Sequence, residues 1–341
     1  MNYVGIDYHK KYSVATVISQ GGAILKKGVI LANRFDAFAD FLKPFGEVTA
    51  VVEATRGWSV PVDILDQLVI KVLLAHPTKL KVIAEHAAKT DQIDSYVLAL
   101  LARAGWIPEA YLRSRPNRDR QLILRVRCFH VRLRTSLKNR IHDLIDRQAE
   151  PVRINAQLYK DLFGKKGLAW LGSLQLAFPA DILLKQLLAA YEVLSAQIRE
   201  SDGLVKDLLK SDPNCQLIAT VPGFGPFFSV LANTEIGVIQ RFFNSSRLCS
   251  YAGIVPSTDS SGGKTRHGPI IKQSNHWLRW AFIEAVAPAV AADAGIRKFY
   301  ESYRQTKGIN VAKVVTARRL CCIVYRVLKQ QSAYYQGVAD R

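Results

Sequence analysis

The stretch that decides the fold is Tyr3-Val4-Gly5-Ile6-Asp7-Tyr8-His9-Lys10, in which a short apolar run ends on a single acid. A second run, Val48-Thr49-Ala50-Val51-Val52, ends in the same way on Glu53. Short apolar runs bounded by polar residues are typical of buried strands. A carboxylate at the end of such a strand cannot face the core alone, because burying an unpaired charge is expensive. We therefore expect Asp7 and Glu53 at the rim of one sheet.

Two more acids follow in Lys89-Thr90-Asp91-Gln92-Ile93-Asp94, just before the apolar run 96–101. Asp91 and Asp94 are three residues apart, so on a helical turn they share one face. Four carboxylates at one rim repel each other unless cations lie between them. Because hard carboxylate oxygens suit Mg²⁺ or Mn²⁺, the sequence predicts a site for one of these ions.

The composition predicts a folded protein that associates with a polyanion. The 341-residue chain is 49% hydrophobic, which supports two or three domains, and its formal net charge is +19. Nucleic acid is the commonest partner of so basic a protein, with acidic proteins or a membrane as the alternative. The five cysteines are odd in number and lack metal-ligand spacing, which fits a reducing cytosol. We expect no signal peptide, and no apolar run reaches transmembrane length.

Residues 1–112 are expected to form an α/β domain with a mixed sheet, because strand-like and helix-like segments alternate there. A helix is expected to begin with Asn33 as its cap, and others from Ser59, near Lys79 and after the acid pair. Strands are expected at about 3–8, 12–18, 23–30, 48–53 and 70–74.

Residues 113–210 are rich in arginine and carry an apolar stripe at helical spacing between 122 and 144, which predicts a long basic amphipathic helix. A second helical stretch, 180–209, could pair with it in an antiparallel hairpin or with its own copy across a dimer, and 163–167 is expected to be a loop. The basic side chains either form a solvated face or contact phosphates, and we favour phosphate contacts. The candidates are Arg118, Arg120, Arg125, Arg127, Arg132, Arg134 and Lys138.

Residues 211–341 are expected to form a mainly helical domain with two glycine-rich features. The first, around Gly223 and Gly225, is a tight turn similar to a helix-hairpin-helix element, in which backbone N–H groups could approach a phosphate. A plain helix turn is the alternative. The second, 257–264, is a polar loop that follows 251–256, and its serines are either turn residues or nucleophiles.

The acid motifs in this order, together with the serine loop, resemble the DEDD transposases of the insertion-sequence-110 family, kin to the Piv/MooV DNA invertases. The resemblance implies a ribonuclease H-like (RuvC-like) N-terminal domain, a helical coiled-coil-like insert and a C-terminal transposase domain with a helix-hairpin-helix. It also implies a catalytic serine just before the glycines, by position Ser261, with Ser260 as the second choice. The acids that would bind the metal are Asp7, Glu53, Asp91 and Asp94.

The resemblance further implies that the serine attacks a DNA phosphodiester and forms a covalent phosphoserine link while the metal assists. It implies an element-encoded non-coding (bridge) RNA that pairs with donor and target DNA. It implies dimers that assemble into a tetramer, in which the acids of one subunit face the serine of another. It also implies a protein that acts at the nucleoid, in the cytoplasm of a prokaryote. Basic residues near the serine could neutralise the phosphoryl transition state: Lys264, Arg266, Lys272 and Arg279.

Two alternatives remain open at this point. The chain could be a RuvC-like nuclease that uses water, or a DNA invertase without an RNA guide, with the serine loop merely structural. It could also be a non-catalytic nucleic-acid-binding protein with vestigial acids. His9, His267 and His276 lie near the motifs but show no metal-site pattern, so we expect each to be structural or to contact phosphate.

Overall fold

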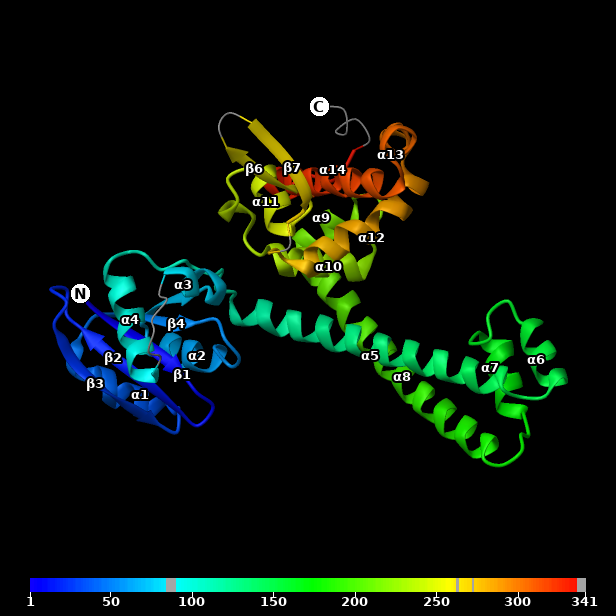
Figure 1. Ribbon diagram of the computed structural model, residues 1–341, viewed down its shortest axis with the longest axis horizontal. Coiled ribbons are helices and arrows are strands. Elements are labelled where there is room, and N and C mark those ends of the chain that lie inside the picture. Colours follow the sequence, from blue (N-terminus) through cyan, green and yellow to red (C-terminus); the bar gives the residue numbers. More distant parts are fainter. Residues whose placement is uncertain (84–89, 262–263, 272, 336–341) are drawn as a thin grey trace. The chain divides into compact units, whose positions relative to one another are not determined.

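The computed structural model describes residues 1–335 except 84–89, 262–263 and 272. The chain divides into two compact units, Met1–Arg113 and Ser114–Arg341 (Figure 1). The first unit mixes strands and helices and the second is mainly helical. The expected α/β unit followed by a helical region is therefore confirmed, whereas a further division at residue 210 stays a prediction.

Five strands form the sheet of the first unit: β1 (Asn2–Tyr8), β2 (Tyr12–Ile18), β3 (Ile24–Leu31), β4 (Val48–Glu53) and β5 (Lys71–Ala75). Their order is β3-β2-β1-β4-β5, with β1, β2 and β3 antiparallel and β1, β4 and β5 parallel. In the parallel pair β1–β4, Ile6 lies opposite Val52. Asp7 and Glu53 are thus the next residues on two neighbouring strands, at the same edge of the sheet.

Helices cover both faces of this sheet: α1 (Phe35–Leu42), the short 3-10 helix η1 (Lys43–Phe45), α2 (Ser59–Gln67), α3 (Pro77–Ile83) and α4 (Asp91–Arg103). Ile6 and Val52 pack with Phe38 of α1 and Leu65 of α2. Val51 packs instead with α4. Because side chains alternate along a strand, the residues that face α4 on β1 and β4 include Asp7 and Glu53.

The expectation that Asn33 caps helix α1 is wrong. Arg34 is the N-cap and makes no capping hydrogen bond through its side chain. Asn33 has a φ of +45°, and this turn directs its side chain toward the β1–β2 connection. There its amide nitrogen donates to the His9 carbonyl at 2.6 Å, and its amide oxygen accepts from the Ser13 hydroxyl at 2.6 Å.

Helix α4 lies directly against strand β1 because Gly5 has no side chain. A Cβ at Gly5 would lie 2.0 Å from the Ser95 carbonyl oxygen and 2.7 Å from the Ala99 nitrogen. The buried hydroxyls of Thr16 and Ser95 share a hydrogen bond of 2.8 Å, which ties α4 to β2 as well. This close contact brings the first turn of α4, which contains Asp91 and Asp94, to the end of β1.

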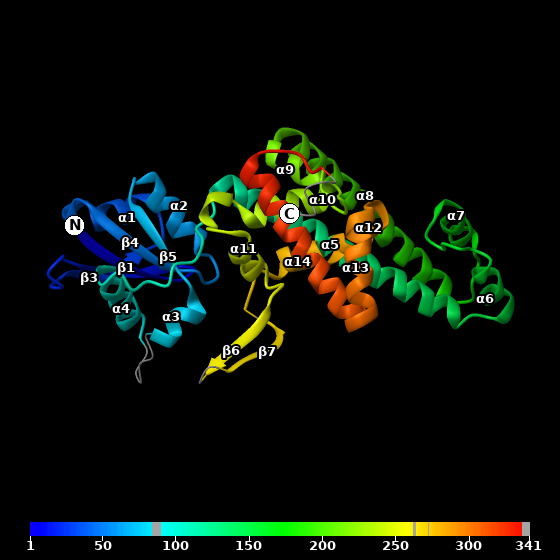
Figure 2. The same ribbon diagram turned by 90° about the horizontal axis from the view of Figure 1, so that it is seen from above.

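In the second unit, α5 (Arg115–Asp146) and α8 (Ala180–Ser211) pack side by side as an antiparallel pair (Figures 1 and 2). The short helices α6 (Glu150–Gln157) and α7 (Lys165–Ser173) lie at one end of this pair and share a core with it. The stretch 163–167, expected to be a loop, is partly helical. A Cβ at Gly167 would lie 2.2 Å from the Leu162 carbonyl oxygen, so this glycine is needed for packing.

The rest of the second unit is helical apart from one hairpin in the described residues. Phe224, Phe282 and Leu320 belong to its main core. The stretch 257–264, expected to be a polar loop, is strand wherever the structure describes it. Residues 257–261 belong to β6 (Pro256–Ser261), and Lys264, which pairs with Ser261, begins β7 (Lys264–Ile270). The elements are α9 (Pro213–Ala219), α10 (Pro226–Ile236), η2 (Ile239–Arg241), α11 (Ser245–Ala252), β6 (Pro256–Ser261), β7 (Lys264–Ile270), α12 (His276–Ala292), α13 (Ala294–Lys307) and α14 (Ile309–Gln330).

The contact at Gly5 predicts that Gly5→Ala destabilises the first unit. The added methyl group would force α4 away from β1, and overpacking of this kind costs about 1–3 kcal/mol. Hydrogen-exchange mass spectrometry of peptides from β1 and α4, in the full chain, measures this loss as faster exchange. Gly21→Ala is the matched control, because the nearest atom to its Cβ would be the Ser19 hydroxyl at 3.7 Å. Equal protection in the two variants would contradict the packing argument.

Candidate active site

Three side chains converge at the edge of the sheet in the first unit. Nε2 of His9 lies 3.2 Å from Oδ2 of Asp7 and 3.1 Å from Oδ2 of Asp91. One ligand atom from each residue lies within 4.8 Å of the other two. Within the described part of the chain, no other three His, Cys, Asp or Glu side chains approach each other this closely. This group is therefore the candidate metal centre.

The turn between β1 and β2 holds His9 in place. The backbone nitrogen of His9 donates to the Tyr12 carbonyl at 2.9 Å, and the two rings pack with centroids 4.8 Å apart. The Tyr12 hydroxyl donates to Oδ2 of Asp91 at 3.3 Å. Together with the hydrogen bond from Asn33 to the His9 carbonyl, these contacts fix the imidazole against the two acids.

The electrostatics of this group favour the binding of a cation. Burial raises the pKa of Asp7 above its ordinary value, His9 opposes this, and the negative charges of Asp91 and Asp94 raise the pKa further. Burial and the charge of Asp91 also raise the pKa of Tyr12, which keeps the phenol neutral as a donor. A divalent ion would compensate the repulsion between the carboxylates, and carboxylate oxygens are the ligands that Mg²⁺ and Mn²⁺ prefer.

The four candidate acids belong to one edge of the first unit. Asp91 and Asp94 are close enough to Asp7 to affect its pKa. Glu53 follows the β4 residue paired with Ile6, on the sheet face that α4 covers. Sequence reasoning gave His9 no metal role, although its position two residues after Asp7 was a signal that it could turn toward the same edge.

The candidate serines belong to the second unit. In the β6–β7 hairpin the backbone of Ser260 pairs with Thr265, and that of Ser261 pairs with Lys264. Arg266 on β7 is exposed. Lys272 lies outside the described residues. The hairpin extends from helices α11 and α12 (Figure 2).

Arg279 closes the base of this hairpin. Its guanidinium donates to the Ile271 carbonyl and to the Ser274 hydroxyl, both just after β7. A Cβ at Gly253, just before β6, would lie 2.3 Å from both the Arg279 guanidinium and the Ser274 hydroxyl oxygen. Arg279 therefore packs between the segment that enters the hairpin and the segment that leaves it. Its contact with phosphate stays a prediction.

A buried acid that the sequence did not reveal joins α5 and α10 to the start of α12. Glu235 on α10 is 1% exposed, forms an ion pair with Arg125 and accepts from the Gln121 amide at 3.1 Å. Its other oxygen accepts from the Asn275 amide at 2.7 Å. Asn275 in turn caps α12 through Leu278. The available signal was a lone acid in the otherwise apolar end of a helix.

Three of the candidate phosphate-binding arginines on α5 are paired inside the second unit. Besides the Arg125–Glu235 pair, Arg120 lies 2.5 Å from Asp212, and Arg127 lies 2.5 Å from Asp202. Arg125 also lies over the Trp277 ring, 3.7 Å from its centroid. The other candidates on this helix are Arg118, Arg132, Arg134 and Lys138, of which Arg132 is exposed. Their contacts with nucleic acid stay a prediction.

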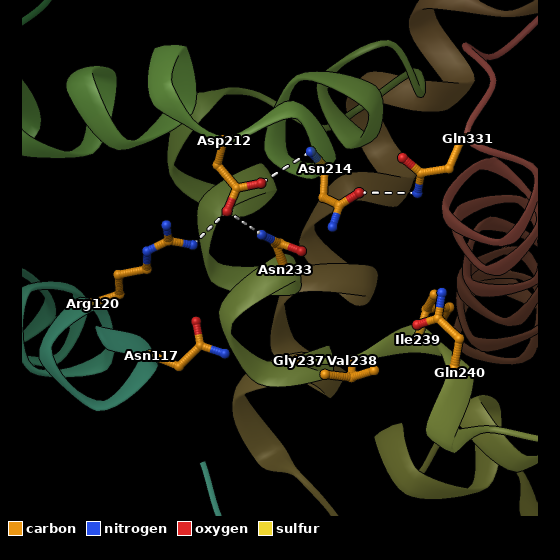
Figure 3. Close-up of a pocket in the computed structure, with 10 residues that line it drawn as sticks. All are labelled: Asn117, Arg120, Asp212, Asn214, Asn233, Gly237, Val238, Ile239, Gln240 and Gln331. Atoms are coloured by element: carbon orange, nitrogen blue, oxygen red, sulfur yellow. Dashed lines mark hydrogen bonds and ion pairs between the residues drawn. The ribbon is translucent and has the colours of Figure 1, made fainter. Parts of the chain in front are cut away.

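Arg120 also lines a polar pocket of about 250 Å³ (Figure 3). Asp212 accepts from the Arg120 guanidinium and, at 3.0 Å, from the Asn233 amide, while its other oxygen accepts from the backbone nitrogen of Asn214. The Gln331 amide donates to the Asn214 side chain at 3.0 Å. These bonds connect α5, α9, α10 and the end of α14, so Arg120 has a structural role.

The two glycines of the helix-hairpin-helix candidate differ. Gly223 has a φ of +90°, and a Cβ there would lie 2.1 Å from the Ala285 carbonyl oxygen, so packing against α12 requires this glycine. Gly225 is the exposed N-cap of α10, and nothing lies within 4 Å of its Cβ position. The binding of a phosphate at this turn stays a prediction. Gly225 is exposed and has open space beside it, so a phosphate could reach the backbone there.

Comparison with known proteins points to one class. A family model of the DEDD transposases of IS110 elements, described as "Transposase", matches residues 4–149. A second model, described as "Transposase IS116/IS110/IS902 family", matches residues 215–301. These two matches identify the chain as a DNA transposase, an enzyme that acts on DNA.

Across the described residues, no helix has both the length and the apolarity needed to cross a membrane.

Relatives agree with this class. The chain is 24% identical to the transposase for insertion sequence element IS1111A of Coxiella burnetii, over 73% of this chain and 69% of that protein. It is 25% identical to a probable family 20 transposase of Pseudomonas aeruginosa, over 64% of this chain and 65% of that protein. A 44.8 kDa protein of the IS116 element of Streptomyces clavuligerus is 24% identical over 45% of this chain and 37% of that protein. The chain belongs to the IS110 family of transposases.

The Glu235 network predicts that Glu235→Gln destabilises the second unit by up to about 3 kcal/mol, because the variant removes the charged partner of the partly buried Arg125. Faster hydrogen exchange in peptides from α10 and α12 measures this loss. Glu301→Gln is the control, since Glu301 pairs with Arg304 at the surface and such pairs contribute at most about 1 kcal/mol. A loss no larger than that of the control would show that the network does not hold these helices.

Proposed function

We propose that this transposase cuts and rejoins DNA with a serine nucleophile assisted by a divalent metal ion. The observation that carries the proposal is the grouping of Asp7 with Asp91 and Asp94, in which burial, and then repulsion from the other two acids, raises the pKa of Asp7. Asp7, Glu53, Asp91 and Asp94 would hold Mg²⁺ or Mn²⁺. When bound, such an ion polarises a phosphate and lowers the pKa of an attacking hydroxyl.

The N-terminal unit is proposed to be a RuvC-like domain. The strand order supports this assignment, since three antiparallel strands continue into two parallel ones with the acids at the end of β1 and β4. The proposed division of the chain is 1–112 for this domain, 113–210 for the basic helical region and 211–341 for the transposase domain.

Ser261 is the proposed nucleophile, with Ser260 as the second choice. The position of Ser261 supports this choice, because it is the last residue of β6, at the end of a hairpin whose base Arg279 and Asn275 hold. The serine hydroxyl would lose its proton and its oxygen would form a bond to a DNA phosphorus as the bond from that phosphorus to a deoxyribose oxygen breaks. The leaving oxygen would take up one proton in exchange. Attack by another DNA end on the phosphoserine would reverse these steps and rejoin the strands.

The partners are proposed from the family and the charge. A net charge of +19 suits binding to both DNA and RNA. We propose donor and target DNA as substrates and an element-encoded bridge RNA as the guide, with Arg132, Arg134, Lys264 and Arg266 among the phosphate contacts. The acids of one subunit would act with the serine of another in a tetramer built from dimers, in the cytoplasm at the nucleoid.

A nuclease that hydrolyses DNA with water is the second candidate function, since the acid group alone would suffice for it. An invertase without an RNA guide would share the serine chemistry. The covalent intermediate separates the first of these from our proposal.

A covalent protein–DNA adduct is therefore expected when the protein reacts with element-end DNA and guide RNA in the presence of Mn²⁺. Ser261→Ala should abolish the adduct because it removes the attacking oxygen, whereas the matched variant Ser260→Ala should retain it. Denaturing gel electrophoresis of end-labelled DNA measures the adduct.

An adduct that persists in Ser261→Ala but is lost in Ser260→Ala would assign the nucleophile to Ser260. DNA cleavage without an adduct in any variant would favour the nuclease.

Asp7→Ala should abolish recombination and leave RNA binding, measured by gel shift, largely intact. Unchanged recombination in that variant would refute the metal site.

A further inference from the structure

Nε2 of His9 has an environment that a simple ion pair does not explain. The atom is buried, and within the described residues no hydrogen-bond acceptor lies in line with it. Yet Oδ2 of Asp7 lies 3.2 Å away and Oδ2 of Asp91 lies 3.1 Å away. An imidazole N–H that donated a hydrogen bond would point at one of these oxygens, because hydrogen bonds weaken steeply away from a straight line.

The two distances from Nε2 to the carboxylate oxygens match those between neighbouring ligands of one metal ion, and all three ligand atoms lie within 4.8 Å of one another. Neighbouring ligands of an octahedral ion are separated by √2 times the metal–ligand distance. Separations of 3.1 and 3.2 Å therefore correspond to bonds of about 2.2 Å, slightly longer than the roughly 2.0–2.1 Å of Mg²⁺. In that arrangement the Nε2 lone pair would point at the ion between the two carboxylates, which agrees with the lack of an aligned acceptor.

The surrounding residues hold the imidazole in this position. The Tyr12 ring packs against it, and the Tyr12 hydroxyl donates to the same Asp91 oxygen that faces Nε2. Asn33 bonds the His9 carbonyl, and Ser13 in turn bonds Asn33. The hydrogen bond from Tyr12 to Asp91 is of the kind that orients carboxylates bound to a metal, while the contacts with Tyr12 and Asn33 position His9 through its ring face and its backbone.

We propose that Nε2 of His9 is a direct ligand of the metal at this site, beside Asp7 and Asp91. The proposal rests on the proposed metal site and adds a nitrogen to its oxygen ligands. Nitrogen is a poor ligand for Mg²⁺ and a better one for divalent ions of the first transition row. The site is therefore selective for ions such as Mn²⁺ over Mg²⁺.

Electron spin-echo spectroscopy of the full-length protein with Mn²⁺ tests this directly, because it detects ¹⁴N nuclei bonded to the ion. The wild type should show an imidazole ¹⁴N signal that changes to ¹⁵N when only histidine is labelled. His9→Gln should lose the signal, and its dissociation constant for Mn²⁺ should rise at least about tenfold, the loss that even an indirect partner of a ligand causes. His142→Gln, an exposed histidine on α5, is the matched control and should retain both properties.

The outcomes separate this inference from the proposed function. Mn²⁺ that binds to the wild type without a histidine ¹⁴N signal would overturn the role of His9 and leave the four acids as the site. A signal that persists in His9→Gln would also overturn it. Wild-type protein that binds no Mn²⁺ would refute the metal site itself. A selective loss in His9→Gln, with binding to Asp7→Asn also weakened, is the expected result.

Discussion

The contact between strand β1 and helix α4 at Gly5 is the constraint on which the candidate active site depends. Without a side chain at Gly5, the helix backbone lies against the strand, and the hydrogen bond between Thr16 and Ser95 keeps it there. One turn earlier on the helix, Asp91 meets the end of β1. Packing energy thus holds together carboxylates that would otherwise separate, and their repulsion contributes to the raised pKa of Asp7.

The two units use charge in opposite ways. In the first, acids gather and repel each other, which makes the group a receptor for cations. In the second, acids such as Glu235 and Asp212 neutralise arginines of α5, so part of the positive charge of that helix stabilises the fold. The positive charge available to nucleic acid is therefore smaller than the arginine content of α5 suggests, and exposed residues such as Arg132 and Arg266 remain for that role.

The sequence predicted those features that depend on local pattern. The strands that end near Asp7 and at Glu53, and the long helix from Arg115, follow from apolar runs and periodicity. The role of Asn33 was mispredicted because a left-handed turn, invisible in propensity, directs its side chain to the β1–β2 turn. Glu235 was missed because its partners are distant in sequence. His9 was missed because its closeness to Asp7 in the sequence does not reveal that Asp91, from a distant helix, faces the same nitrogen.

Repulsion among these acids persists in the fold because a bound divalent ion compensates it. Calorimetric melting of the wild type and of Asp7→Asn tests this claim most directly. A raised pKa means that folding disfavours ionised Asp7, so in chelator at neutral pH the variant should melt above the wild type. The gap should narrow as the pH falls through the raised pKa of Asp7 and be absent below about 4, its ordinary value. Mn²⁺ should then raise the melting temperature of the wild type more than that of the variant, because only the intact site binds the ion tightly. Asp36→Asn, on the exposed start of α1, should behave as the wild type does. An Asp7→Asn protein that melts below the wild type in chelator, with equal shifts for both in Mn²⁺, would contradict the account.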